Sequence, residues 1–440
     1  MLPNSGRPEF GRGEFGAEGA GGGGHRFRRP MSDSLKPRDA KDVEQAVQWA
    51  LSEGKTVEIV GAGTKRAIGR PIQTDLTLDL SALTGVTLYE PEELVLSARA
   101  ATPLAEIEAL LDASGQQLAF EPMDCGPILG GACSRATIGG TLAANLSGPR
   151  RIKAGAARDH LLGFHAVSGR GEIFKSGGRV VKNVTGYDLC KLMAGSFGTL
   201  AALTEITIKT LPKPETEETV LLRGLAPAAA VATMAAAMAS PCDVSGAAHL
   251  PADVAARIPA DEIAGAGTAL TALRLEGFAP SVAQRRQMLE GELRRFGELH
   301  AAGPLVSRAL WRAVRDAAPF AANGDRSARP VWRVSTQASR GAELAGRIAE
   351  ETRGRVLFDW AGGLLWLEPE ADGDAAAAII ARAVAASGGH AMLMRAPAPV
   401  RASVDVFSPH DAALAALTKR VKESFDPRGI LNPGRMWAGV

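Results

Sequence analysis

Apolar side chains recur with helical or strand spacing along most of the chain, and this pattern predicts a series of short elements. One stripe with i, i+3, i+4, i+7 and i+8 spacing runs through Val43, Ala46, Val47, Ala50 and Leu51. This spacing predicts a helix that begins near Asp39 and ends at Gly54. The stretches 57–60 and 76–80 cluster or alternate apolar residues instead, and both predict strands.

The pattern continues through the middle of the chain. Residues 94–98 predict a strand, and the apolar spacing after Pro103 predicts a helix that ends at Gly115. Residues 161–174 predict a β-hairpin with a glycine-rich turn. The segment LPKP at 211–214 then marks a domain boundary.

Beyond residue 215 strands alternate with alanine-rich helices, and this order predicts an α+β domain with an antiparallel sheet, ferredoxin-like in its arrangement. The helices are expected near 226–239, 280–297, 341–353 and 374–387. A last helix begins near Ser408 and leads into the turn-rich sequence FDPRGILNPGRMW.

The first 33 residues lack any such periodicity. Residues 1–30 contain nine glycines, with charged residues between them and no apolar run typical of a secretory signal. We expect residues 1–33 to form a disordered glycine-rich tail, because they cannot bury enough apolar surface to fold. Met31 is a candidate for the true start of the protein.

Composition and charge exclude several classes of function. A chain of 440 residues has room for two or three domains, and a net charge of +2 gives no electrostatic case for binding nucleic acid or an anionic membrane. No apolar run approaches the roughly 20 residues of a transmembrane helix. The four cysteines form no C-x-x-C pair, so we expect free thiols and no metal site.

Three glycine-rich segments carry the candidate chemistry, and the first is TVEIVGAGTKRAIG at 56–69. A strand followed by a loop almost free of side chains lets a backbone approach a phosphate. The dinucleotide and P-loop motifs both require glycine where Arg66 stands, so neither applies. An ordinary strand-ending turn explains this loop as well as a ligand site does.

The second and third segments are TIGGTLAANLSG at 137–148 and AGSFGT at 194–199. Gly139 and Gly140 would each cost about 1 kcal/mol in a helix interior. They therefore predict a buried loop against a flat ligand, or else simple turn glycines. Ser196 resembles a hydrolase nucleophile, but its expected flanks run helix–turn–strand, the reverse of a nucleophile elbow.

Together the three segments and the terminal DPRGILNPG resemble the FAD-binding domain of the vanillyl-alcohol-oxidase superfamily, the PCMH-type fold. The resemblance covers about residues 36–214 and the last 15 residues. It implies an α+β protein: a two-lobed FAD-binding domain over 34–214, then a smaller α+β, ferredoxin-like domain over 215–440 that binds substrate or partners. The lobes would span about 36–90 and 91–214, and residues 426–440 would return to the flavin site.

Within this superfamily the chain resembles most the FAD-binding subunits of bacterial glycolate oxidase, through GPRRIKAGAARDHLLG and the lysine of VVKNVTGYDL. The resemblance implies that backbone N–H groups of the first loop hold the FAD pyrophosphate, that the TIGG segment follows the cofactor, and that the AGSFGT turn lines its adenine side. The candidate FAD-binding residues are Gly61, Ala62, Gly63, Thr64, Lys65, Gly69, Thr137, Gly139, Gly140, Asn145, Gly195, Ser196, Gly198, Thr199, Ile206 and Asn432.

The resemblance also has departures. Many superfamily members attach FAD through a histidine of the first loop, but this chain has no histidine between residues 26 and 159, so we expect noncovalent FAD. Relatives that oxidise 2-hydroxy acids carry an H-x-G-D-G-N-type segment, which is absent here. The sequence therefore nominates no catalytic residue. Lys182 is a candidate cation near the flavin, or a solvated loop lysine.

These observations predict an FAD-dependent oxidoreductase that works as a subunit of a glycolate oxidase complex and converts glycolate to glyoxylate. The resemblance implies a catalytic flavoprotein subunit and an iron–sulfur subunit as partners. It implies a cytoplasmic location, with association to the inner face of the membrane through those partners. Two alternatives stay open at this point: a self-sufficient FAD-dependent 2-hydroxy-acid dehydrogenase, and a structural subunit that retains the fold.

Overall fold

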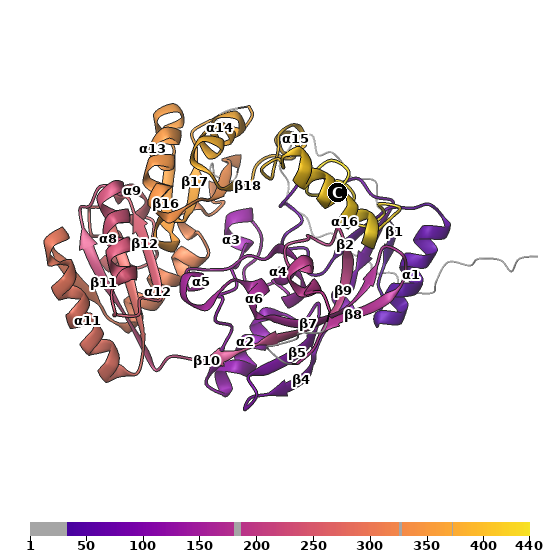
Figure 1. The fold of residues 1–440 in the computed structure, drawn as a ribbon, viewed down its shortest axis with the longest axis horizontal. Coiled ribbons are helices and arrows are strands. Elements are labelled where there is room, and N and C mark those ends of the chain that lie inside the picture. Colours follow the sequence, from indigo (N-terminus) through magenta and orange to yellow (C-terminus); the bar gives the residue numbers. More distant parts are fainter. Residues whose placement is uncertain (1–32, 180–185, 325–327, 372) are drawn as a thin grey trace, which may run out of the picture.

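The protein divides into two parts that lie side by side (Figure 1), as seen in a computed structural model that describes residues 33–179, 186–324, 328–371 and 373–440. Within the described residues, the N-terminal part carries three small sheets, and the C-terminal part carries one large sheet. The last helix and the final residues of the chain return to the N-terminal part.

The first lobe is a parallel three-stranded sheet with strand order β1-β3-β2. Its elements are β1 (Asp33–Leu35), α1 (Ala40–Ser52), β2 (Val57–Val60) and β3 (Leu76–Asp79). Asp39 caps α1 by accepting a hydrogen bond from the Asp42 amide at 2.8 Å, which confirms the predicted start of this helix. The disordered tail was expected to include residue 33, but Asp33 is the first residue of β1.

The second lobe is an antiparallel sheet with strand order β4-β5-β9-β7-β8. Its strands are β4 (Val86–Glu90), β5 (Val95–Arg99), β7 (Leu161–Ser168), β8 (Ile173–Gly177) and β9 (Ala201–Lys209). Val86 to Glu90 pair with β5, so they already belong to the second lobe. The boundary between the lobes therefore lies before residue 86, and not at residue 90 as expected. The predicted hairpin is confirmed, with β7 paired to β8.

Short helices connect these strands. They are α2 (Leu104–Ala113), α3 (Gly126–Leu129), α4 (Ile138–Ala144), α5 (Arg151–Ala154), α6 (Ala157–His160) and α7 (Leu189–Met193). A two-stranded ribbon joins β6 (Gln116–Gln117) to β10 (Leu211–Pro212). The prediction of a loop at Gly139 and Gly140 was wrong, because both glycines lie inside α4. Tertiary packing, described below, outweighs their poor helix propensity.

The C-terminal part contains two successive βαββαβ units. The first consists of β11 (Thr216–Arg223), α8 (Pro227–Ala239), β12 (Gly246–Leu250), β13 (Leu270–Gly277), α11 (Ala279–Leu293) and β14 (Leu299–Ala302). The second consists of β15 (Val331–Ser335), α13 (Gly341–Thr352), β16 (Arg355–Asp359), β17 (Leu364–Glu368), α14 (Ala377–Ser387) and β18 (His390–Arg395).

The two units form one eight-stranded sheet, in which the order β14-β11-β13-β12 is followed by its mirror sequence β16-β17-β15-β18. In each unit the strands lie in the order four, one, three, two, which is the ferredoxin-like arrangement. The units join through β12 and β16, where His249 pairs with Phe358. The predicted ferredoxin-like domain is therefore confirmed, and it occurs twice.

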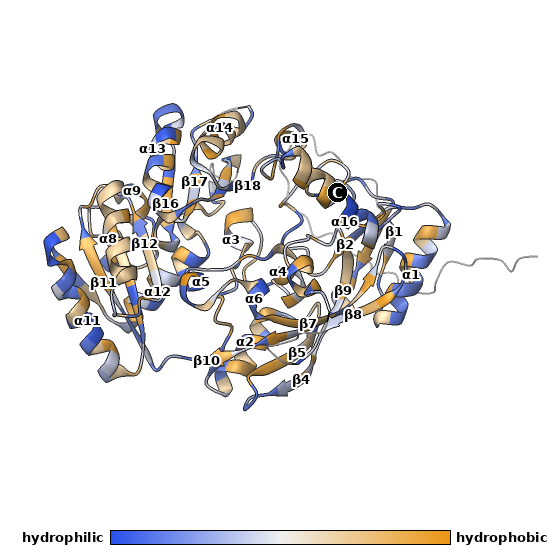
Figure 2. Ribbon diagram, viewed as in Figure 1, coloured by the Kyte–Doolittle hydropathy of each residue, from blue (hydrophilic) through white to orange (hydrophobic). Residues whose placement is uncertain are grey.

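Four helices form a layer on this sheet, since α11 contacts α8, α8 contacts α13 and α13 contacts α14. Figure 2 shows that the strands are mostly apolar while α11 and α13 alternate apolar and polar residues. Inside the first unit, α9 (Ala252–Ala255) and α10 (Asp261–Ala264) lie between β12 and β13 along the chain, and α12 (Pro304–Arg315) connects the first unit to the second. The tryptophans Trp311, Trp332, Trp360 and Trp366 are all buried in this part, which makes them core residues.

The chain then returns to the first lobe through α15 (Ala398–Ser403) and α16 (Ala412–Phe425). Val57 of β2 donates its amide to the Ile430 carbonyl at 2.8 Å. The buried Lys422 ammonium donates to the Thr199 and Leu431 carbonyls and to the Asp426 carboxylate. These bonds fix the C-terminal segment against both lobes.

Candidate functional site

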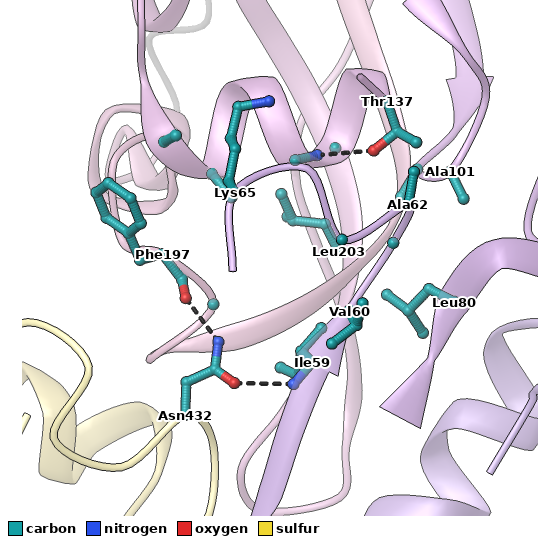
Figure 3. A pocket seen from close by; sticks show the side chains of 18 of the residues that line it. Ile59, Val60, Ala62, Lys65, Leu80, Ala101, Thr137, Phe197, Leu203 and Asn432 are labelled. Atoms are coloured by element: carbon teal, nitrogen blue, oxygen red, sulfur yellow. Dashed lines mark hydrogen bonds between the residues drawn. The ribbon is translucent and has the colours of Figure 1, made fainter. Parts of the chain in front are cut away.

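A pocket opens where the end of β2, the helix α4 and the 196–198 turn meet the C-terminal segment (Figure 3). Its empty volume is about 830 Å³, including the part open to solvent. Eleven of the predicted FAD-binding residues line it: Gly61, Ala62, Gly63, Thr64, Lys65, Thr137, Gly139, Gly140, Ser196, Gly198 and Asn432.

The loop after β2 presents backbone N–H groups to this pocket. Gly63 has a φ of +73°, a left-handed conformation that glycine adopts without strain. Within the described residues, the amides of Ala62, Gly63 and Thr64 donate no hydrogen bond to another part of the chain. Amide donors left free at one turn form a concave surface that suits a phosphate oxygen.

Lys65 adds a buried positive charge to the same wall. Its side chain is 9 % exposed, and its Nζ has no hydrogen-bond partner within the part of the chain that the structure describes. A buried ammonium without a partner is costly, and the cost falls when an anion binds beside it. This orphaned donor fits an anionic cofactor such as FAD.

Two glycines of α4 open the opposite wall. Thr137 caps this helix by accepting from the Gly140 amide at 3.3 Å. A Cβ on Gly139 would meet the Ala100 backbone at 2.6 Å, so Gly139 allows the helix to pack on the chain behind it. A Cβ on Gly140 would meet only the Thr137 hydroxyl, at 3.2 Å. Gly140 therefore leaves room on the pocket side, as a flat ligand requires.

Asn432 joins two walls of the pocket (Figure 3). Its Nδ2 donates to the Phe197 carbonyl at 2.7 Å, and its Oδ1 accepts from the Ile59 amide at 2.8 Å. Phe197 has a φ of +51° at the tip of its turn. Both ends of the Asn432 amide are thus engaged by backbone groups, which makes this residue a clamp that shapes the pocket.

Five predicted residues do not line the pocket: Gly69, Asn145, Gly195, Thr199 and Ile206. Gly69 packs on Arg435, where a Cβ would lie 2.8 Å from the Arg435 carbonyl. Asn145 ends α4 with a φ of +50°, and Gly195 donates to the Leu142 carbonyl of α4. Thr199 and Ile206 are buried in the fold. These five residues therefore pack around the pocket and do not line it.

Other lining residues were not predicted, namely Ile59, Val60, Arg66, Leu80, Ala100, Ala101, Ala143, Ala144, Phe197, Ala201, Leu203 and Arg435. Most of these residues are apolar. Arg66 forms an ion pair with the buried Glu58. The Ser196 hydroxyl donates to the Met193 carbonyl at 2.8 Å and is buried, so it is not arranged as a nucleophile. Lys182 lies outside the described residues.

Comparison with known proteins agrees with this geometry. The sequence family described as FAD binding domain matches residues 34–177. Glycolate oxidase subunit GlcE of Escherichia coli is 34 % identical over 395 residues, which cover 90 % of this chain and 96 % of GlcE. The chain belongs to the family of this glycolate oxidase subunit.

Other relatives match a shorter stretch of the chain. D-2-hydroxyglutarate dehydrogenase of Xanthomonas citri is 32 % identical over 194 residues, or 44 % of this chain and 39 % of the relative. Among solved structures, p-cresol methylhydroxylase aligns with a TM-score of 0.68 at 13 % identity, covering 91 % of this chain and 88 % of that one. The chain is therefore an FAD-dependent oxidoreductase with the predicted PCMH-type α+β fold.

Within the described ranges, no three His, Cys, Asp or Glu side chains are grouped as metal ligands. None of the described helices has the length and apolar character needed to cross a membrane.

Proposed function

We propose that this chain is the FAD-binding subunit of a multi-subunit glycolate oxidase that oxidises glycolate to glyoxylate. The observation that carries the proposal is the match to GlcE over 96 % of that subunit, together with a pocket built for an anionic, flat cofactor. Bound FAD would supply the chemistry, since a flavin accepts the hydride that leaves the alcohol carbon.

The residues of the pocket would hold the cofactor in three ways. The free amides of Ala62, Gly63 and Thr64 would donate to the pyrophosphate, and Lys65 would neutralise part of the cofactor's negative charge. The Gly140 side of α4 would leave space for the flat ring system. Asn432 would hold the Phe197 turn in place against β2.

The lining of the pocket also supports noncovalent attachment. FAD is commonly bonded to a histidine in related enzymes with a covalent cofactor, and none of the described residues that line this pocket is a histidine. We therefore expect FAD to be held by hydrogen bonds, charge and shape alone.

We further propose that the chain works with a catalytic flavoprotein subunit and an iron–sulfur subunit. The similarity to glycolate oxidase subunit GlcD of Bacillus subtilis, 29 % over 188 residues, is confined to 42 % of this chain, which supports a separate role for the two kinds of subunit. Cys125, Cys190 and Cys242 are buried free thiols. We also propose that the complex is cytoplasmic and reaches the inner face of the membrane through the partners of this chain.

The decisive experiment is to purify the chain alone and together with its two partners. Trichloroacetic acid should release all flavin into the supernatant, and glycolate-dependent dye reduction should require the complete complex. Yellow colour that stays in the pellet would contradict noncovalent FAD. Rapid glycolate oxidation by the chain alone would replace the proposal with a self-sufficient 2-hydroxy-acid dehydrogenase, and a complex that is fully active without this chain would leave it a structural role.

A further inference from the structure

Two arginines from different parts of the protein meet at one indole ring. The Arg151 guanidinium, from α5 of the N-terminal part, lies 4.1 Å from the centre of the Trp360 ring. The Arg333 guanidinium, from β15 of the C-terminal sheet, lies 4.9 Å from the same ring. Trp360 itself donates its Nε1 to the Gly148 carbonyl at 3.0 Å, which ties the ring to the N-terminal part.

Neither guanidinium has a polar partner among the residues that the structure describes. Within the described residues, Arg151 and Arg333 donate no side-chain hydrogen bond and form no ion pair. The preceding residue shows the contrast, because Arg150 forms an ion pair with Glu276 at 2.7 Å. The buried Arg274 likewise donates two hydrogen bonds to the Glu121 carboxylate, at 2.8 and 2.9 Å. Arginine is normally retained inside a protein by such bidentate contacts.

Little negative charge acts on the two cations at Trp360. Burial, followed by the nearby Arg151 charge, lowers the pKa of Arg333 to about 10. Of the two groups that raise the pKa of Arg333, the Asp359 carboxyl acts more strongly than the Cys125 thiol, yet burial raises the pKa of Asp359 itself to about 7. Among the described residues Asp359 makes no ion pair, and its Oδ1 is occupied by the Trp360 amide at 2.7 Å.

The backbone at this point adds an independent sign of a built site. Trp360 and Ala361 have φ values of 52° and 57°, two successive non-glycine residues in the left-handed region. Such residues cost roughly 1–3 kcal/mol each and are concentrated at ligand-binding positions. The strained turn fixes the indole between the two parts of the protein, where it meets both guanidinium groups.

We propose that Arg151 and Arg333 bind the carboxylate group of a small organic acid, with the Trp360 ring as the floor of the site. A guanidinium matches a carboxylate by two parallel hydrogen bonds, and an anion would relieve the repulsion between the two cations. Trp366 and Met392, which pair with Arg333 on β17 and β18, supply apolar surroundings that favour a small acid over a phosphate. The choice of a 2-hydroxy acid or its oxidised product as the ligand rests on the proposed function.

Binding to the FAD-loaded chain tests the proposal without any turnover. Oxalate, glycolate and inorganic phosphate are titrated by isothermal calorimetry, with the emission of tryptophan as a second signal. We expect oxalate and glycolate to bind, and Arg333→Gln or Arg151→Gln to weaken both by about tenfold or more, as loss of a hydrogen bond between charged groups does. Arg333→Lys should recover only part of the affinity, because an ammonium lacks the planar fork.

Arg347→Gln is the matched control, since Arg347 is exposed and pairs with Glu343 on the surface of α13. Flavin content and melting temperature establish that each variant is folded. Undiminished oxalate binding by both folded Gln variants would overturn the site, as would the absence of any binding to the natural chain. Phosphate binding as tight as that of oxalate would overturn the assignment to carboxylates.

The oxalate-binding test gives its result whether or not the complete complex oxidises glycolate. If the complete complex fails to oxidise glycolate while the Gln variants lose oxalate, the site stands and the proposed function fails. If the complex is active and the variants bind oxalate normally, the proposed function stands and this site is overturned.

Discussion

A Cβ added to Gly139 would lie 2.6 Å from the carbonyl oxygen of Ala100, so these two backbone segments are in direct contact. The next glycine has no such neighbour, since a Cβ on Gly140 would meet only the Thr137 hydroxyl. Two adjacent residues of α4 therefore have different functions: one lets the helix pack, and the other leaves space in the pocket.

This difference gives the first prediction. Gly140→Val should yield a folded protein that has lost most of its FAD, because the branched side chain occupies space beside the cofactor. Gly139→Val should unfold the N-terminal part, because its side chain would overlap the Ala100 backbone. Flavin absorbance per chain and circular dichroism distinguish the two outcomes. A Gly140→Val protein that keeps stoichiometric flavin would show that α4 does not contact the cofactor.

Lys65→Met is expected to separate cofactor binding from stability. The Lys65 ammonium is buried without a partner among the described residues, so its removal should raise the melting temperature of the FAD-free protein. The same change should weaken FAD binding and reduce the stabilisation that added FAD provides. Differential scanning fluorimetry across an FAD titration measures both effects. Equal FAD-dependent shifts in the natural and variant proteins would place Lys65 away from the cofactor.

The ion network between the two parts of the protein should contribute strongly to stability. Arg274 is 1 % exposed and donates twice to Glu121, which comes from the N-terminal part. Glu121→Gln leaves the buried guanidinium without its full counter-charge and should lower the free energy of unfolding by about 3–5 kcal/mol. Urea denaturation followed by tryptophan emission measures the loss.

The control for this network is Glu351→Gln, whose partner Arg382 lies on the surface. Exposed pairs contribute about 0–1 kcal/mol, so this variant should unfold close to the natural protein. Equal losses in the two variants would mean that the buried network does not hold the parts together.

The raised pKa of Asp359 predicts how the stability of the protein depends on pH. Burial raises the pKa of this carboxyl from 3.8 to about 7, so the folded protein keeps a proton that the unfolded chain has already released. The contribution of Asp359 to stability therefore falls as the pH rises from about 4 to about 7. Asp359→Asn retains the acceptor for the Trp360 amide and removes the titration.

Melting temperatures from pH 5 to pH 8 test this point. The difference in stability between Asp359→Asn and the natural protein should grow in favour of the variant by about 3 kcal/mol between pH 5 and the folded pKa of about 7, and then stay level. A difference that stays constant with pH would show that Asp359 is ionised across the whole range.

The sequence predicts the cofactor loop better than its surroundings. Gly63 and Asn432 could be assigned because glycine and a terminal asparagine stand in a recurring order of motifs. The helix at Gly139 could not be predicted, because this glycine is explained by its packing on Ala100, a residue far from it along the chain. Local propensity alone favours a loop there.

The pairing of Arg151 with Arg333 could not be predicted either. The two residues are far apart in sequence, and each resembles a surface arginine when taken alone. Only the turn of Trp360 brings them together. The repeat in the C-terminal part was also partly hidden, because periodicity identified the strands but gave no sign that β12 and β16 lie next to each other.

The clamp made by Asn432 has a consequence for biosynthesis. This residue bonds the amide of Ile59, which precedes it by 373 residues. A ribosome must therefore complete nearly the whole polypeptide before the wall of the pocket can close. The nascent chain would emerge with its glycine loop already made yet unable to retain a flavin nucleotide, so loading of the cofactor should follow release of the finished protein.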